Sequence, residues 1–372
     1  MGNSCQRSVP SINIEELESH GFLFTTTGSA IGYRNTQEDT VKLYQTKHTT
    51  KTIPKFLMSA IFDGHYESYC SEYLKTHFVD AICNKQILSV HKFLSTDHMK
   101  SSFLTLDKEM EEKKFNCDEN VFDLEKIARK TGSCCNAVFI VPIKSKDDSK
   151  IYDVSCVNVG DSRAIIIFDD ENDPIQMSND HKTSYEGEVE RIYDCGVDIF
   201  NARVGGKLAV TRAFGDFEFK KNPKFSKEKQ AVICIPEIKT ERIVVKPGKR
   251  VVVFHACDGV WDVLTNSCLS EFINYELDIQ KNDPTRYSSK RKKRMDEFKQ
   301  KFDQLNDNNE VILNGEEDYF CIQPKDDKKY DSKAILKDII YTCIFGIVLK
   351  NSYVVSCDNV TASMTILENP KC

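Results

Sequence analysis

The chain has 372 residues, of which 40% are hydrophobic and 29% are charged, and its formal net charge is -6. These values describe a globular protein large enough for one big domain or two average ones. The mild acidity argues against a nucleic-acid-binding protein, which more often has a basic face, so we expect no nucleic-acid partner.

The 15 cysteines are scattered singly apart from the pair Cys134 and Cys135, and no C-x-x-C spacing indicates a zinc or redox site. We expect reduced, mostly buried thiols in a cytoplasmic protein. The first 20 residues contain no apolar run of the length that a signal peptide requires. The longest apolar stretch, residues 339–349, is too short to span a membrane and is expected to be a core helix.

Residues 1–20 are polar and are expected to form a flexible arm. Strands are expected where Val, Ile and Phe gather, and helices where apolar residues recur at helical spacing. The expected strands are residues 56–62, 137–142, 153–159, 164–168, 250–256 and 362–367, and the expected helices are residues 69–82 and 90–110. Gly160-Asp161-Ser162 predicts a hairpin turn between two of these strands. This order favours an antiparallel sheet or sandwich covered by helices.

The composition changes between residues 281 and 333, where Asp, Asn, Lys and Glu dominate. We expect a charged insertion on the domain surface there, part helical and part disordered. It includes the basic run Lys-Arg-Lys-Lys-Arg at residues 290–294. This run is interpreted as a solvated face, with a nuclear-import signal, and therefore a nuclear location, as the alternative.

Three acidic residues have the same unusual setting, in which an apolar run leads into an Asp beside Gly or Asn. They are Asp63, Asp258 and Asp358. Asp-Gly alone is a common turn. If the three meet at one edge of a sandwich, however, carboxylates ~4 Å apart repel by about 4 kcal/mol per pair at an effective dielectric constant near 20. A divalent cation would relieve that repulsion, and oxygen donors favour Mg²⁺ or Mn²⁺ over Zn²⁺.

Eight motifs resemble, in order, the series of the type 2C metal-dependent serine/threonine protein phosphatases. They are residues 32–39 (GYRNTQED), 62–65 (FDGH), 131–133 (TGS), 158–164 (NVGDSRA), 180–182 (DHK), 203–216 (RVGGKLAVTRAFGD), 258–262 (DGVWD) and 358–361 (DNVT). One such motif is weak evidence, but eight in the correct order over residues 22–367 make coincidence implausible. The resemblance implies an α+β fold over residues 21–369, a four-layer α-β-β-α sandwich of two antiparallel sheets flanked by helices.

The resemblance also implies a site for two Mg²⁺ or Mn²⁺ ions per chain. Asp63 would bridge both ions, and the carbonyl of Gly64 would help to bind one of them. Asp258 and Asp358 would hold the other. Water between the ions would be the nucleophile that hydrolyses phosphoserine or phosphothreonine in protein substrates.

Further residues take roles by the same resemblance. Glu38 and Asp39 would act mainly through metal-bound waters, and Asp161 matches a weaker third-metal position. Arg34 would bind the phosphate through its guanidinium fork, and the other interpretation is a surface ion pair with Glu38 or Asp39. His65 would be the general acid that protonates the leaving serine or threonine oxygen, in place of a merely structural histidine.

Other parts of the motifs are expected to be structural or to differ from the family. Trp261 is expected to pack in the core. Lys207, Thr211 and Arg212 are expected to be structural, because their motif supports the metal edge in the family. Residues 181–203 match a mobile flap that could contact substrate, and its pattern is fitted by Glu188, Arg191 and Ile192. Tyr66 stands where the family usually has a second glycine, and Cys134-Cys135 replace a Ser/Thr-rich pair. Tyr66 could narrow the site or alter substrate choice.

The N-terminal sequence resembles an acylation signal. Gly2 is placed for myristoylation and Cys5 for a palmitoyl chain, although Gln6 replaces the preferred Ser or Thr. Peripheral membrane association would follow, and an unmodified arm is the alternative. We expect a monomer. A pseudophosphatase that only binds a partner is the rival function, but the metal carboxylates whose loss would indicate it are all present.

Overall fold

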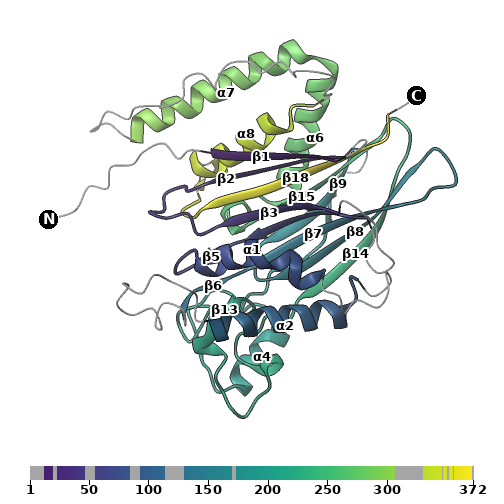
Figure 1. Cartoon of the computed structure of the whole chain (residues 1–372). Coiled ribbons are helices and arrows are strands. Elements are labelled where there is room, and N and C mark those ends of the chain that lie inside the picture. Colours follow the sequence, from purple (N-terminus) through teal and green to yellow (C-terminus); the bar gives the residue numbers. More distant parts are fainter. Residues whose placement is uncertain are drawn as a thin grey trace.

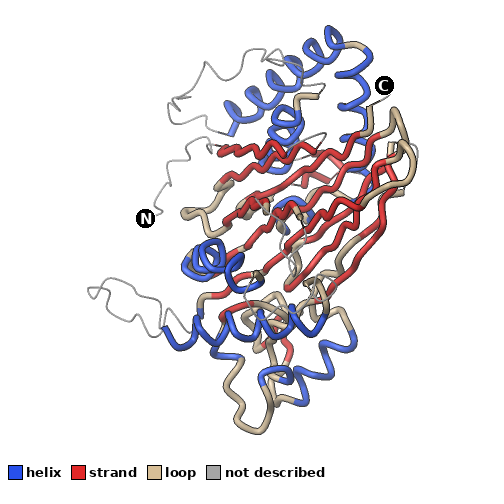
Figure 2. Tube along the Cα trace, turned by 45° about the vertical axis from the view of Figure 1, so that its right-hand side comes forward, coloured by secondary structure: helices blue, strands red, loops and turns tan. Residues whose placement is uncertain are grey.

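Two antiparallel sheets stack face to face, with helices on both outer faces (Figure 1). The computed structural model describes residues 12–19, 23–46, 55–83, 93–113, 130–169, 173–305, 330–345, 347–349, 352–354 and 356–370. Gly2 and Cys5 therefore lie outside the described residues. The strands form a central block between the helices (Figure 2). The structure confirms the expected α+β class.

The two large sheets contain the strands that the apolar runs predict and several others. The five-stranded sheet has the order β14 (Glu237–Val245), β8 (Lys150–Val159), β7 (Cys135–Ile143), β4 (Leu57–Phe62) and β3 (Thr40–Gln45). The six-stranded sheet has the order β1 (Ile12–Ser19), β2 (Leu23–Ala30), β18 (Val360–Glu368), β15 (Arg250–Ala256), β9 (Arg163–Phe168) and β10 (Ile175–Gln176).

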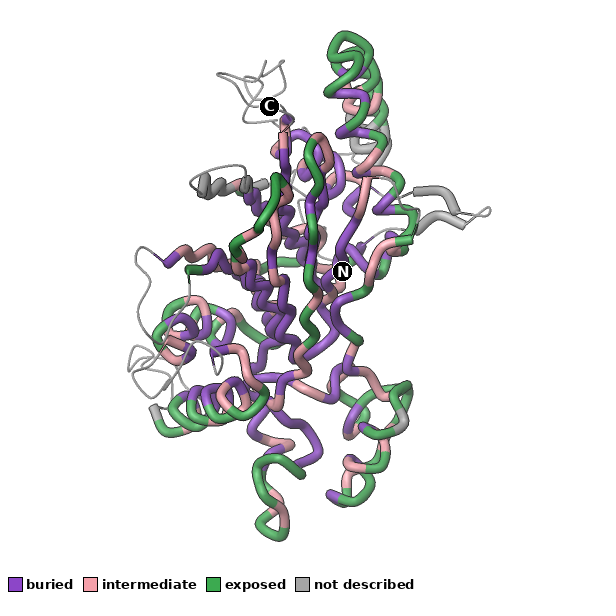
Figure 3. The backbone as a smooth tube through the Cα atoms, turned by 90° about the vertical axis from the view of Figure 1, so that its right-hand side faces the viewer, coloured by how far each residue is buried: buried purple, intermediate pink, exposed green. Residues whose placement is uncertain are grey.

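Successive residues of the central strands are buried on opposite faces, because side chains alternate along a strand. In β15, Val251 and Val253 belong to the apolar cluster between the two sheets, whereas Val252 and Phe254 belong to the cluster under the helices. A third apolar cluster lies under the helices on the other face of the five-stranded sheet. Three apolar layers thus join four layers of structure, and buried residues are concentrated along the strands (Figure 3).

Helices cover each sheet on its outer face. The helices α1 (Tyr69–Ile82) and α2 (Thr96–Lys113) pack on the five-stranded sheet, and α5 (Asp258–Trp261), α6 (Asn266–Asn282) and α8 (Ser332–Phe345) on the six-stranded sheet. Trp261 is buried, with its ring at 5.9 Å from that of Phe254, as expected for a core residue. Among the helices of the described residues, none is both long enough and apolar enough to cross a membrane.

The remaining elements are short. They are β5 (Gly64–His65), β6 (Gly132–Ser133), β13 (Phe214–Gly215), α4 (Glu186–Asp194), β11 (Ile199–Phe200), β12 (Arg203–Val204), the 3-10 helices η2 (Phe217–Phe219) and η3 (Lys227–Lys229), β16 (Ile347–Leu349) and β17 (Ser352–Val354). The apolar stretch 339–349 is therefore helical only as far as Phe345, and its last residues form β16.

Two expectations about the chain path are wrong. Residues 12–19, which we placed in a flexible arm, form β1 and pair with β2 along its length. The acidic residues of this segment do not indicate a strand in the sequence. They are tolerated here because β1 is an edge strand, where charged side chains are common. The expected hairpin over residues 153–168 is also absent, since β8 and β9 lie in opposite sheets. Three residues span about the 10 Å between packed sheets, so Gly160-Asp161-Ser162 crosses from one sheet to the other.

The helix α7 (Pro284–Leu305) occupies the first part of the expected insertion and packs outside α6 and α8 (Figure 1). Two arginines of its basic run take part in that packing. Arg294 forms ion pairs with Glu276 at 2.6 Å and Asp338 at 2.7 Å, and Arg291 with Asp338 at 3.2 Å. The lysines at 290, 292 and 293 are exposed. The run is therefore a solvated face only in part.

Candidate metal and catalytic site

The three acidic residues of similar setting meet at one edge of the sandwich. Asp63 follows β4 of the five-stranded sheet, and Asp258 lies just beyond β15 of the six-stranded sheet. Asp358 lies between β17, which belongs to neither large sheet, and β18. The strand β18 runs antiparallel to β15 and so begins at the edge where β15 ends. Asp63 thus comes from one sheet and Asp258 and Asp358 from the other, where two antiparallel strands end and begin at the same edge.

Asp63, Asp258 and Asp358 are half-buried, and Asp39 and Asp161 beside them are buried. Burial raises the pKa of Asp63 well above its usual value, and the charges of Asp39 and Asp258 raise it further. Burial also raises the pKa of Asp258, as do the charges of Asp161 and Asp358. Burial raises the pKa of Asp39 to about 6, although hydrogen bonds lower it. Negative charge is thus concentrated in a place that disfavours it, unless a cation is bound.

The donor atoms of this cluster suit a hard divalent cation. Ligand atoms of Asp63, Asp161 and Cys134 lie within 4.8 Å of one another, and so do those of Asp39, Asp63 and Cys257. Oδ2 of Asp39 is buried without a hydrogen-bond partner. An orphaned carboxylate oxygen among other carboxylates fits an ion of the Mg²⁺ or Mn²⁺ type.

The segment that carries Glu38 and Asp39 is held to this edge by Asn359. The Asn359 side chain accepts a hydrogen bond from the Glu38 N–H at 2.8 Å and donates to the carbonyls of Ile31 and Thr36. A Cβ at Gly64 would lie 2.3 Å from the Glu38 carbonyl oxygen, so this segment packs directly on Gly64. Burial raises the pKa of Glu38, and the charge of Arg34 lowers it.

Arg34 lies at the exposed rim of the cluster. One of its Nη atoms is 2.5 Å from Oδ2 of Asp358, and its Nε donates to the carbonyl of Cys357 at 3.0 Å. The ion pair is thus with Asp358 and not with Glu38 or Asp39. About half of the Arg34 side chain is exposed, which leaves the guanidinium accessible at the mouth of the site.

Asp161 lies on the side of the cluster nearest the expected flap. Nζ of Lys182 is 3.2 Å from Oδ2 of Asp161, and Sγ of Cys134 is 3.5 Å from Oδ1. Asp262, one turn beyond Asp258, also lies here: burial raises its pKa, the charge of Lys182 lowers it, and that of Asp161 raises it. We did not single out Asp262 from the sequence, although its i, i+4 spacing from Asp258 puts both on one helix face.

His65 contacts an acidic residue that the sequence analysis did not single out. Its Nε2 lies 2.7 Å from Oδ2 of Asp216, which is buried at the end of the sixth motif. Burial lowers the pKa of His65, but the charge and hydrogen bond of Asp216 raise it, and the balance is a raised pKa. The Phe-Gly-Asp sequence at 214–216 is the signal that could have indicated this residue.

Tyr66, directly after His65, has a backbone φ of 70, in the left-handed region that favours glycine. Its ring is half exposed, and Nζ of Lys130 lies 5.2 Å from the ring centroid. Glycine adopts this backbone conformation easily, which explains why it suits position 66. Tyrosine has to adopt the same conformation although its side chain disfavours it.

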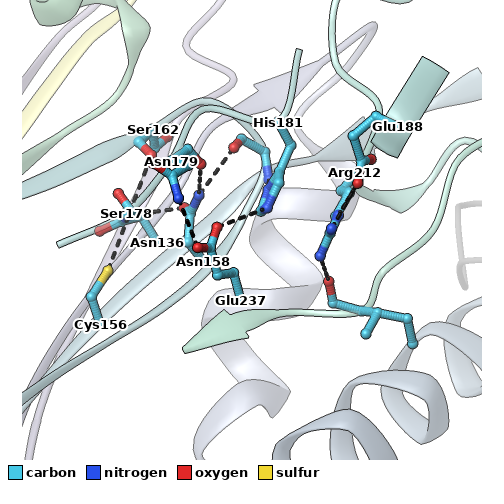
Figure 4. Close-up of polar contacts among 12 residues, drawn as sticks. Asn136, Cys156, Asn158, Ser162, Ser178, Asn179, His181, Glu188, Arg212 and Glu237 are labelled. Carbon is cyan, nitrogen blue, oxygen red and sulfur yellow. Dashed lines mark hydrogen bonds and ion pairs between the residues drawn. The ribbon is translucent and has the colours of Figure 1, made fainter. Parts of the chain in front are cut away.

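The helix α4 lies in the expected flap and is firmly attached. Glu188 is buried and forms ion pairs with Arg191 and with Arg212, the latter at 2.7 Å (Figure 4). Burial raises the pKa of Glu188, but the two arginines lower it to about 2. Ile192 is fully buried beneath the helix. The residues that match the flap pattern thus anchor the helix to the domain.

A buried polar network supports the crossover that carries Asp161. Asn158 donates to the carbonyls of Gly160 and Asn179, and the N–H of Gly160 donates to Nδ1 of His181 at 3.1 Å (Figure 4). Nε2 of His181 lies 3.4 Å from Glu237 on the neighbouring strand. These bonds fix the loop where it leaves the five-stranded sheet.

Comparison with known proteins agrees with this arrangement. The family model described as Protein phosphatase 2C matches residues 26–297. A probable protein phosphatase 2C of Caenorhabditis elegans is 34% identical over 235 residues, which are 62% of this chain and 57% of that protein. Protein phosphatase 1B of Rattus norvegicus is 31% identical over 231 residues, which are 59% and 53%. The chain thus spans little more than half the length of these curated relatives.

Solved structures of low sequence identity share the fold. A phosphatase from a pathogenic strain of Toxoplasma gondii has a TM-score of 0.62 and 19% identity, with 97% of this chain and 96% of that chain covered. A serine-threonine phosphatase 2C from Toxoplasma gondii has a TM-score of 0.53 and 15% identity, with 97% and 100% covered. Together with the family model, which matches most of the chain, this shows that the protein belongs to the protein phosphatase 2C family.

Proposed function

We propose that the protein is a metal-dependent serine/threonine phosphatase that hydrolyses phosphoserine and phosphothreonine in proteins. The observation that carries this proposal is the half-buried group of carboxylates around Asp63, whose charges raise one another's pKa and which have too few cationic neighbours to offset those charges. Asp63, Asp258 and Asp358 would hold two Mg²⁺ or Mn²⁺ ions with the Gly64 carbonyl. Asp161 would hold a weaker third.

The residues around the cluster would divide the chemistry among them. When bound, the cations supply the charge that activates water for attack on phosphorus. Arg34, exposed at the rim, would bind two phosphate oxygens through its fork. Glu38 and Asp39 would orient the waters that are bound to the metal ions. His65 would donate a proton to the leaving oxygen as the phosphorus–oxygen bond breaks, so that a neutral serine or threonine hydroxyl departs.

The experiment is phosphate release from phosphoserine and phosphothreonine peptides with Mn²⁺ or Mg²⁺, against a chelator control. Activity that persists in the chelator would refute the mechanism. His65→Ala should lower turnover of phosphoserine peptides by ~10²-fold or more, and that of an aryl phosphate much less, because its leaving group departs without a proton. Equal losses on both substrates would mean that His65 is not the acid.

A partner-binding pseudophosphatase is the rival function, and the same assay distinguishes it. Such a protein would bind a phosphopeptide but release no phosphate at saturating Mn²⁺. All of the candidate metal carboxylates are present at the metal edge, which favours an active phosphatase over a pseudophosphatase.

For location, we propose that Gly2 and Cys5 are acylated and that the enzyme associates partly with membranes. One myristoyl chain binds a membrane only marginally, so Cys5 would supply the second anchor. The alternative, nuclear import through residues 290–294, is less favoured because Arg291 and Arg294 are engaged in ion pairs with α6 and α8. Fractionation tests this: Gly2→Ala should release the protein and Cys5→Ser should weaken its attachment. An unchanged distribution would reject the anchor.

A further inference from the structure

A small three-stranded sheet beside the metal edge joins three motifs that are far apart in the sequence. Its strands are β13, β6 and β5, in that order. Gly132 in the middle strand is paired with His65 on one side and Gly215 on the other. The His65 side chain and that of Asp216, the residue after Gly215, are thereby brought together across Gly132.

The contact depends on the absence of a side chain at position 132. A Cβ at Gly132 would lie 2.1 Å from Oδ2 of Asp216 and 2.3 Å from Nε2 of His65, the two atoms that are 2.7 Å apart. Real Cβ atoms essentially never make contacts this short. The Asp216 side chain is 3% exposed and that of His65 is 28% exposed, so the carboxylate is enclosed and the ring reaches solvent.

Asp216 is held firmly in an unfavourable backbone conformation. Its φ is 49, in the left-handed region, and its N–H donates to the carbonyl of Thr131 at 2.9 Å. Beneath it, the carboxylate of Asp107 accepts hydrogen bonds from the Gly215 N–H at 2.8 Å and from Nζ of Lys220 at 2.9 Å. Such strain persists where the surrounding structure determines it, and it is concentrated at functional sites.

We propose that Asp216 is a positioning residue for His65, an inference that rests on the proposed phosphatase function. Its carboxylate accepts the Nε2–H, which fixes the ring orientation and leaves Nδ1 to serve the substrate. As the phosphorus–oxygen bond breaks, the Nδ1 proton of the imidazolium passes to the leaving oxygen. The ring becomes neutral and keeps its Nε2–H on Asp216, which stays ionised throughout, as buried carboxylates do beside other catalytic histidines.

The first test is Asp216→Asn, because Asn tolerates the left-handed conformation better than most residues. With a phosphoserine peptide, kcat should fall by about 10- to 100-fold, and with an aryl phosphate by less than about 3-fold, because only the first leaving group needs the proton. In the His65→Ala background the same substitution should cause no further loss, since Asp216 acts through His65. Glu218→Gln, which removes a surface ion pair two residues away, is the control and should leave both substrates unaffected.

The second test separates the two side chains without removing either. Gly132→Ala places a methyl group between the His65 and Asp216 side chains. It should lower kcat with the phosphoserine peptide much more than with the aryl phosphate, as Asp216→Asn should. Glu218→Gln serves again as the control, because it removes only a surface ion pair. A third measurement does not depend on activity: at a pH high enough for the His65 ring to be neutral, ¹⁵N NMR should show its Nε2–H tautomer in the metal-free wild type and a mixture of tautomers in Asp216→Asn.

Other outcomes contradict the inference in distinguishable ways. A wild type without metal-dependent turnover would overturn the phosphatase function and this inference with it. An active wild type in which Asp216→Asn loses equal activity on both substrates would overturn the positioning role alone. So would losses that add fully in the double variant, or an unchanged tautomer in Asp216→Asn.

Discussion

Two regions of the molecule bury carboxylates, and they balance the charge in different ways. At the metal edge, Asp63 and Asp258 meet other carboxylates, which raise their pKa beyond the effect of burial. In the helical layer over the six-stranded sheet, Asp338 is fully buried, whereas Asp63 and Asp258 are only half-buried, and it faces Arg291 and Arg294. Burial raises its pKa to about 6, and the two arginines act against that rise.

The difference separates a structural charge from a functional one. A buried carboxylate with its own arginines is complete within the chain, and here it links α7 and α8. A buried carboxylate whose neighbours are also acidic needs a cation from outside the chain, because isolated buried charge is costly. Burial alone therefore does not identify a functional site, whereas the sign of the neighbouring charges does.

The largest expected effect compares Asp63→Asn with Asp338→Asn in turnover. Asp63→Asn should nearly abolish turnover at saturating Mn²⁺, because it removes charge that positions metal. Asp338→Asn should leave kcat almost unchanged in the folded fraction. Circular dichroism and turnover measured on the same samples check this. Near-normal turnover in Asp63→Asn would refute the assignment of the metal edge.

For stability, Asp338→Asn should be the harmful substitution and Asp63→Asn the harmless one. Asp338→Asn leaves the largely buried guanidinium of Arg291 without its carboxylate and that of Arg294 with Glu276 alone, which should lower the free energy of unfolding by about 2 to 3 kcal/mol. Asp63→Asn in chelator should raise it, because one repelling charge is removed. Urea denaturation measures both. As a control, Asp338→Asn combined with Arg291→Gln should recover part of the loss, and a loss that simply adds would show that the pair is not coupled.

The sequence alone predicts the parts of the fold that depend on local pattern. The strand at residues 250–256 matches β15 because alternating apolar residues are buried on both faces. The acidic residues of the motifs could be grouped at one edge, because a sandwich brings strand ends together. The helix at residues 69–82 matches α1 because its apolar stripe faces the sheet.

Features that depend on partners distant in the chain could not be predicted. A glycine-containing turn looks the same whether the next strand returns to the same sheet or crosses to the other, so the path from β8 to β9 was misjudged. The basic run shows no sign of its inward ion pairs, because Glu276 and Asp338 belong to other helices. Asp216 was missed because its contact with His65 exists only once β5, β6 and β13 pair.

A smaller effect concerns pH. Unfolded aspartates have a pKa near 3.9, whereas folded Asp39 has a pKa of about 6 and that of Asp63 is raised well above its usual value. Above pH ~4 the aspartates of the folded metal-free edge therefore hold more protons than they do in the unfolded chain, and their contribution to stability falls as the pH rises. Asp338 contributes with the same sign, but Mn²⁺ should not affect its share.

Thermal unfolding at about pH 5 and pH 7, in chelator and in Mn²⁺, checks this sign. Burial lowers the pKa of His255 to about 3, which favours the folded state as the pH rises and acts alike in every sample. We therefore compare differences: the change in Tm between the two pH values should be more negative in chelator than in Mn²⁺, and Asp63→Asn should reduce that difference. The same pH dependence in wild type and Asp63→Asn, both in chelator, would contradict the electrostatic account of the edge.

The two regions also differ in backbone strain. Among the described residues, the non-glycine residues with positive φ are Tyr66, Asn201, Ala202 and Asp216, and none belongs to the helical layer of α6, α7 and α8. A bulky residue in the left-handed region costs roughly 1 to 2 kcal/mol. Tyr66 therefore reduces stability at a position next to the candidate general acid, while the helical layer carries no such cost.

The smallest expected effect compares the same substitution in both regions. Tyr66→Gly should raise the free energy of unfolding by about 0.5 kcal/mol, because relief of the strain exceeds the extra entropy of glycine and the lost contact with Lys130. Tyr275→Gly, at an exposed tyrosine inside α6, should lower it by about 1 kcal/mol, because glycine disfavours a helix interior. Each tyrosine loses one contact with a lysine, Lys130 over the Tyr66 ring and Lys290 at the Tyr275 hydroxyl, so backbone conformation decides the difference in sign. Destabilisation of equal size at both positions, measured by urea unfolding, would show that Tyr66 is stabilised by its contacts and stores no strain at the catalytic edge.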